Sequence, residues 1–199
     1  MSRMLAIAAL VASAAHSASA QSPPQWFSIP ADAVYETGDT WTASGARYRL
    51  YGVQACLRGT SFTNQHGIAR DCGEASLAML VSLVRDLKPQ CYVAAVDPAT
   101  RLNFVLCFAT LTKGAGAGSR LDLATALIST GYSFASLTPD AKPVHMPYFV
   151  AQIVAQRSKA GLWQFPDMPD PNGVILRAMR AASPASSSPA SMPGSRRSE

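Results

Sequence analysis

The chain has 199 residues, of which 48% are hydrophobic and 15% charged, and its formal net charge is +5. Without Arg3 and the charged residues at positions 196–199 the charge falls to +3, and Arg177 and Arg180 at the domain edge carry two of those charges, which leaves about +1. That balance argues against a broadly cationic nucleic-acid-binding surface, although a local basic patch remains compatible with it.

The first twenty residues have the pattern of a secretory signal peptide. Arg3 precedes an apolar run from Met4 to about Ala15, and Ala18-Ser19-Ala20 is a small-x-small cleavage pattern. The run is shorter than the roughly 20 apolar residues of a membrane span, so we predict no membrane anchor in the mature chain. The mature protein is expected to begin at Gln21 and to be exported, to the periplasm or the extracellular space.

Residues 21–180 are predicted to form one domain, because roughly 160 residues is a natural size for a single hydrophobic core. Residues 181–199 are mostly Ala, Ser and Pro. Such a segment cannot bury enough apolar surface to offset the entropy of ordering, so a disordered tail is expected.

Most of the predicted strands lie in the N-terminal half. Aromatic and β-branched runs that flank a Gly or Asp-Pro turn are typical of hairpins, and the turns here are Ser44–Ala46 and Asp97–Thr100. The predicted strands are Trp26–Ile29, Thr40–Ala43, Arg47–Tyr51, Cys91–Val96 and Leu102–Phe108.

Three helices are predicted from apolar residues at helical spacing. The first starts near Asp71 or Cys72 and ends before Pro89, the second covers about 121–130 and stops at Gly131, and the third runs from Pro147 to before Gly161. Ser119 has the character of an N-cap for the second helix, and the glycine-rich run 114–118 that precedes it lacks the spacing of a phosphate loop and is expected to be a surface loop. This order of elements predicts an α+β fold in which a small β-barrel packs against helices.

The four cysteines are Cys56, Cys72, Cys91 and Cys107. An even number of cysteines in an exported chain suggests disulfides, and three pairings are available. The favoured pairing joins Cys91 to Cys107, because they flank the second hairpin, and Cys56 to Cys72 by elimination. A zinc site is improbable, because no two cysteines have Cys-x-x-Cys spacing.

Several ordered segments between Trp26 and Phe165 resemble the staphylococcal-nuclease-like (thermonuclease) family. The resemblance implies a five-stranded OB-type barrel with three helices, a fold that commonly binds oligonucleotides or oligosaccharides on one face. It also implies an exported bacterial member of the family. The matching segments are Gly38-Asp39-Thr40, Tyr48–Val53, Gly73–Leu77, Asp97–Arg101, Leu121–Gly131 and Ala160–Trp163.

The resemblance also implies site residues. Active members of the family hydrolyse DNA or RNA phosphodiesters with Ca²⁺; Asp39 matches a metal-binding carboxylate, and Arg49 and Arg101 match the two arginines that bind phosphate. Each residue also has an ordinary structural interpretation. Asp39 suits a turn, Arg49 an exposed strand position and Arg101 a solvated turn.

The next positions depart from the family pattern. Gln54 stands where a second metal-binding carboxylate is expected, and Leu57 where a water-activating Glu is expected. Loss of a general base typically lowers the rate about 10²- to 10⁴-fold. The nearest carboxylates, Asp71 and Glu74, have the spacing of a helix capping box, which favours a structural role.

The sequence therefore predicts an exported thermonuclease-like domain with a degenerate active site, leaning away from an enzyme. Its expected function is to bind a phosphate-bearing polymer such as nucleic acid, another acidic polymer, or a protein partner, with at most weak Ca²⁺ binding at Asp39. Two alternatives stay open. One is an active Ca²⁺-dependent nuclease with a rearranged site, and the other is a structural component of an envelope or secretion assembly.

Overall fold

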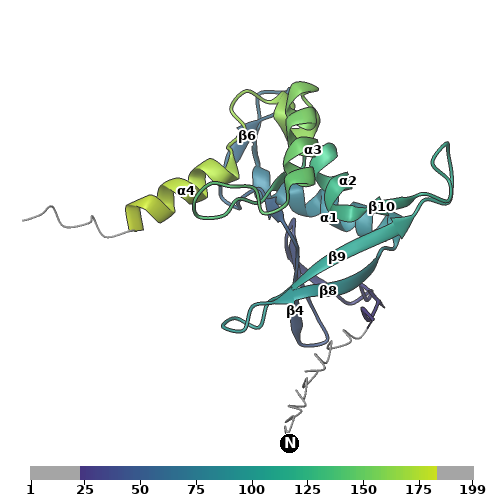
Figure 1. Ribbon diagram of the computed structural model, residues 1–199. Coiled ribbons are helices and arrows are strands. Elements are labelled where there is room, and N and C mark those ends of the chain that lie inside the picture. Colours follow the sequence, from purple (N-terminus) through teal and green to yellow (C-terminus); the bar gives the residue numbers. More distant parts are fainter. Residues whose placement is uncertain (1–22, 183–199) are drawn as a thin grey trace, which may run out of the picture.

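The structure is a computed structural model that describes residues 23–182 (Figure 1). The predicted signal peptide, residues 1–20, lies outside the described residues, as do residues 183–199 of the predicted tail. Among the helices of the described part, none combines the length and hydrophobicity needed to cross a bilayer.

A seven-stranded sheet curls into a half-barrel against the helices (Figure 1). Its order is β1-β8-β9-β4-β3-β2, with β10 paired to β9, and all neighbours are antiparallel except the parallel pair β4 and β9. Two short pairs, β5 with β11 and β6 with β7, complete the β-structure. The strands are β1 Phe27–Ser28, β2 Val34–Thr37, β3 Thr40–Ala43, β4 Ala46–Leu50, β5 Val53–Ala55, β6 Ser61–Thr63, β7 Ala69–Asp71, β8 Gln90–Val96, β9 Asn103–Thr110, β10 Arg120–Asp122 and β11 Ser133–Ala135.

The five predicted strands correspond to β1, β3, β4, β8 and β9. The sequence prediction missed the others, most of which have only three residues. Segments this short carry little alternation of polar and apolar residues, so their strand geometry comes from pairing with distant parts of the chain, as β5 does with β11. The pairing register of these short strands therefore depends on tertiary contacts, which the local sequence pattern does not specify.

The helices are α1 Cys72–Leu87, α2 Leu123–Ser129, α3 Met146–Arg157 and α4 Pro171–Ala182, and a short 3-10 helix, η1, covers Gly161–Gln164. The mixed α+β class is confirmed, but the prediction of three helices is wrong because α4 was missed. Figure 1 shows α1, α2 and α3 gathered over the sheet, with α4 extending to one side.

The ends of the helices are set by local capping. The Asp71 carboxylate accepts a hydrogen bond from the Glu74 amide at 2.8 Å, which confirms the predicted capping role at the start of α1. The predicted cap at Ser119 is wrong. Residues 120–122 instead continue the sheet as β10, and the Asp122 carboxylate caps α2 through the amides of Ala124 and Thr125.

Both favoured disulfides are present, and each lies in a hydrophobic cluster. Cys91 and Cys107 are directly opposed across β8 and β9, and their bond is buried in the main core with Trp41, Leu50 and Leu127 among other residues. The second disulfide fastens the segment after β5 to the first turn of α1. It joins Cys56 to Cys72 in a smaller cluster that also contains Phe62, Phe134 and Leu162.

Candidate functional site

The Gly38-Asp39 turn joins β2 to β3 and packs tightly on α1. A Cβ atom at Gly38 would lie 2.5 Å from the Ser76 Cβ, so only glycine fits at this approach. The Ser76 hydroxyl donates to the Tyr132 carbonyl and accepts from the Cys56 amide at 3.1 Å. Helix α1 thereby fixes the position of both the turn and the end of β5.

Asp39 is almost completely buried, with 2% of its surface exposed. Its Oδ1 accepts hydrogen bonds from the hydroxyls of Thr37 at 2.6 Å and Thr40 at 2.8 Å. Its Oδ2 accepts from Arg49 Nε at 3.1 Å and from the Ala55 amide at 3.1 Å, and lies 2.9 Å from Arg49 Nη2. Donors from the chain therefore use both carboxylate oxygens, which leaves Asp39 little capacity to bind another group.

The ion pair with Asp39 uses only some of the N–H donors of Arg49. One edge of its guanidinium, Nε with Nη2, faces Asp39, and Nη2 also donates to Gln54 Oε1 at 2.9 Å. Gln54 is held in turn because its Nε2 donates to the Ala55 carbonyl at 2.9 Å. Within residues 23–182 no partner binds Arg49 Nη1, and 30% of the side chain is exposed. Both N–H groups of Nη2 are engaged, by Asp39 and by Gln54, so Nη1 is the nitrogen that remains available to an anion.

Three arginines line one cavity of about 340 Å³ beside Asp39. Arg47 and Arg49 come from the same face of β4, because they are two residues apart on a strand. Arg58 comes from the loop that follows β5, and its Nε donates to the Glu36 carbonyl at 3.3 Å. The other residues that line the cavity are Thr37, Asp39, Thr40, Gln54, Ala55, Cys56, Leu57 and Ile175.

Two carboxylates offset part of this positive charge. Arg47 Nη2 lies 2.6 Å from Glu36 Oε2, and Asp39 pairs with Arg49. Within residues 23–182 the ion-pair partner of Arg58 is the Glu74 carboxylate, at 4.0 Å, and both of those side chains are largely exposed. Exposed pairs of this kind contribute little energy. Among the described residues that line the cavity, three are arginines and one is acidic, so the lining is positively charged, and Glu36 and Glu74 offset that charge from outside the lining.

The stabilisation that Glu36 contributes to the fold depends on pH. A hydrogen bond from the Thr42 hydroxyl lowers the pKa of Glu36 below its ordinary value of 4.5; partial burial opposes the effect, and Arg47 adds to it. A lowered folded-state pKa means that the stabilisation is present above 4.5 and is lost as the pH falls through the folded pKa.

We therefore expect the stability gap between the wild type and Glu36→Gln to shrink as the pH falls from about 5 to about 3, because protonation removes the charge that the variant already lacks. Urea unfolding of both proteins across this range measures the gap. A gap that stays constant over the range would show that Glu36 does not titrate in this way.

Of the site residues that were predicted from the sequence, Asp39 and Arg49 are in direct contact, but Arg101 does not contact either of them. Arg101 ends the turn between β8 and β9 with a left-handed backbone (φ 57°), and its amide donates to the Asp97 carbonyl at 2.8 Å. It is exposed and is not among the residues that line the arginine cavity.

The residues around Asp39 do not fit a Ca²⁺ site. Calcium takes six to eight oxygen ligands, usually including several carboxylates. Of the described cavity-lining residues, Asp39 is the one acidic side chain, and its oxygens already accept hydrogen bonds. In the described part of the chain, no three His, Cys, Asp or Glu side chains gather in a way that could hold a metal ion.

Leu57 lines the cavity at the position where the family resemblance implies a water-activating Glu. An aliphatic side chain can neither accept a proton nor orient a water molecule by hydrogen bonding. The nearby Asp71 is committed elsewhere, since its Oδ2 accepts from the Gly59 amide at 2.7 Å while its Oδ1 caps α1. Glu74 instead extends into solvent.

Arg47, Arg58 and Ile175 are cavity residues that the sequence reasoning did not nominate. A signal for Arg47 was present, because its two-residue spacing from Arg49 places both side chains on one face of a strand. Nothing local marks Arg58, whose position depends on the Cys56–Cys72 disulfide. Ile175 belongs to α4, the helix that was missed.

A comparison with known protein families and with curated proteins finds no match to this chain.

Proposed function

We propose that the chain is a thermonuclease-like OB-type barrel that binds a phosphate-bearing polymer in the arginine cavity without cleaving it. The observation that carries this proposal is the state of the Asp39–Arg49 pair. Asp39 is saturated by donors from the chain, whereas Arg49 Nη1 is bonded to no other group of the described chain. The pair thus presents a cation rather than a metal-binding carboxylate.

A phosphate suits the cavity because guanidinium N–H groups donate charge-assisted hydrogen bonds to phosphate oxygens, and Arg49 offers Nη1 for such a bond. Arg49 is held in place by Asp39 and Gln54, so it loses less conformational freedom on binding than an unsupported side chain would. Arg47 flanks it on the same strand, and Arg58 flanks it from the loop that follows β5. Spacing of cations along one face is suited to the repeated charges of a single-stranded nucleic acid.

The same geometry supports binding rather than hydrolysis. Leu57 supplies no general base, and Gln54 is engaged with Arg49 and with the backbone. Loss of the base alone lowers a hydrolytic rate by about 10²- to 10⁴-fold. We also propose export to the periplasm or the extracellular space, which the two disulfides support because such bonds persist in oxidising compartments.

The test is a titration of a fluorescein-labelled single-stranded oligonucleotide, DNA or RNA, followed by anisotropy at several salt concentrations. Each phosphate contact contributes about 0.7 to the slope of log affinity against log salt for a single strand. We expect the double variant Arg47→Gln/Arg58→Gln to reduce the magnitude of this negative slope by about 1.4, so that binding depends less on salt. Arg157→Gln removes an exposed charge on α3 and is the matched control.

An unchanged slope in Arg47→Gln/Arg58→Gln would reject the cavity as the binding site. Absence of binding by the wild type at low salt would reject the nucleic-acid proposal altogether. Arg101→Gln tests separately whether the turn that precedes β9 extends the binding surface, as the sequence resemblance implies.

A second prediction concerns a substitution that blocks the cavity without changing its charge. Ile175 reaches the cavity from α4 and is only partly buried. We expect Ile175→Trp to weaken oligonucleotide binding at least about tenfold, because its bulk would displace phosphate groups from Arg49 and Arg58. Val174→Trp on the same helix is the control, since Val174 does not line the cavity. Equal losses in both variants would point to a disturbance of α4 itself.

A further inference from the structure

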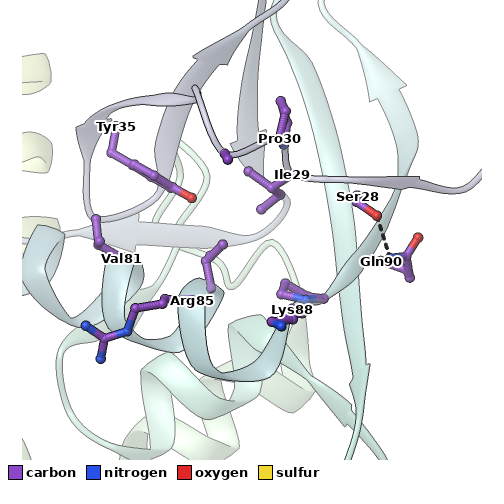
Figure 2. Close-up of a pocket in the computed structure, with 11 residues that line it drawn as sticks. Ser28, Ile29, Pro30, Tyr35, Val81, Arg85, Lys88 and Gln90 are labelled. Atoms are coloured by element: carbon purple, nitrogen blue, oxygen red, sulfur yellow. Dashed lines mark hydrogen bonds between the residues drawn. The ribbon is translucent and has the colours of Figure 1, made fainter.

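A second cavity, of about 610 Å³, lies between α1 and the segment that connects β1 to β2. It shares no lining residue with the arginine cavity. Its volume falls within the range of roughly 300–1,000 Å³ that is typical of small-molecule sites. Figure 2 shows its walls, with the β1–β2 segment on one side and the C-terminal half of α1 on the other.

The body of this cavity is apolar. Val81 lines the cavity from α1, and 37% of its surface is exposed. Burial of such apolar surface by a ligand favours binding, because it removes the surface from water. The apolar lining residues are Ile29, Pro30, Ala31, Val81, Val84 and Pro89.

Few polar groups approach this apolar body. Figure 2 shows the Tyr35 side chain reaching across the cavity with its hydroxyl directed toward Ile29. The Tyr35 phenol keeps its proton at neutral pH and can donate a hydrogen bond, and burial raises its pKa further above 10.0. Gln90 is already engaged, because its Nε2 donates to the Ser28 hydroxyl at 2.7 Å.

Two cationic side chains, Arg85 and Lys88, line this cavity, and they differ in whether an acidic residue pairs with them. Arg85 is paired with the neighbouring Asp86, with Nε 2.8 Å from Oδ1. Lys88 has a left-handed backbone (φ 47°) that ends α1 just before Pro89, and its amide donates to the Val84 carbonyl at 2.9 Å. Its ammonium forms no ion pair with any residue of the range 23–182. Lys88 is thus the uncompensated charge beside an apolar cavity.

We propose that this cavity binds a small amphipathic carboxylate, with its apolar chain against Val81 and Ile29 and its carboxylate at Lys88. The Tyr35 hydroxyl offers a second donor. Cations in the last turn of a helix also offset the helix dipole. That structural role requires no ligand, so the experiment has to separate the two.

The experiment compares decanoate, decanol and decyltrimethylammonium by isothermal titration calorimetry on the folded protein. The two ionic ligands are kept below their micelle concentrations and decanol below its solubility limit. We expect decanoate to bind at a ratio of one to one and decanol at least about tenfold more weakly, because a charge-assisted hydrogen bond is lost. The cationic analogue should not bind. Equal affinity for decanoate and decanol, or no binding of decanoate up to its solubility limit, would overturn the proposal.

Variants locate the site. Lys88→Gln should weaken decanoate binding by about tenfold and leave decanol unaffected. Lys159→Gln is the matched control, since Lys159 is also an exposed lysine with a left-handed backbone (φ 53°) but lies outside the cavity. Val81→Phe should weaken binding of both ligands by narrowing the cavity at the contact proposed for the apolar chain, with thermal unfolding confirming that the fold is kept. Unchanged decanoate binding in both Lys88→Gln and Val81→Phe would contradict the assignment.

Discussion

Replacing Asp39 with Asn is expected to lower the free energy of unfolding by about 3 kcal/mol, the lower end of the range for breaking a buried ion pair, because Arg49 is partly exposed. The loss has a second source. An Asn amide must direct its NH₂ group at the Thr37 and Thr40 hydroxyls or at the donors on the other side, Arg49 and the Ala55 amide. Urea unfolding of the folded domain measures the difference.

The control for this prediction is Asp140→Asn, which removes an exposed carboxylate that lies 2.8 Å from Lys142 Nζ. Surface pairs of this kind contribute at most about 1 kcal/mol. We therefore expect Asp39→Asn to lower the free energy of unfolding clearly more than Asp140→Asn does. Similar small losses in both would mean that Asp39 is not the structural partner of Arg49 that the geometry indicates.

Removing the Cys56–Cys72 disulfide with two Ala substitutions is expected to lower stability by about 3 kcal/mol, from the loop-closure entropy of the unfolded chain. It should also abolish oligonucleotide binding under conditions in which the protein is still folded. Cys56, Leu57 and Arg58 line the arginine cavity, and the disulfide fastens that segment to α1. Chemical denaturation and anisotropy measure the two effects separately.

The chain contains its own control for this experiment. The Cys91–Cys107 disulfide has the same sequence separation, 16 residues, but it lies across the β8–β9 ladder and contributes nothing to the cavity. Its removal should cost a similar free energy, about 3 kcal/mol, and leave binding in the folded protein intact. If loss of either disulfide affected binding equally, the effect would be one of stability alone.

The elements that could be predicted from the sequence are those with strong local signals. The Thr40–Ala43 strand carries Trp and Thr beside a Gly turn, and its predicted bounds are those of β3. The Cys91–Cys107 pairing followed from a hairpin whose two strands are long and apolar. By contrast, Asp122 caps α2 because β10 continues to that residue, and β10 exists only through its pairing with β9.

The candidate site was predicted in part. Asp39 and Arg49 were chosen from a family resemblance, and they do lie together. Their relationship was not predictable, because sequence cannot tell whether a carboxylate will bind a metal or neutralise a neighbouring arginine. That depends on donors such as the Ala55 amide, which only the folded chain brings to Asp39. The placement of Arg58 likewise depends on the Cys56–Cys72 disulfide and the loop that it anchors.

The most direct test of binding without cleavage is to incubate the folded protein with a labelled single-stranded oligonucleotide and Ca²⁺, then measure its length on a denaturing gel. A parallel sample contains a chelator. Because Asp39 is saturated by internal donors and Leu57 supplies no base, we predict that the oligonucleotide remains full length in both samples. Cleavage that proceeds with Ca²⁺ and stops with the chelator would contradict this account.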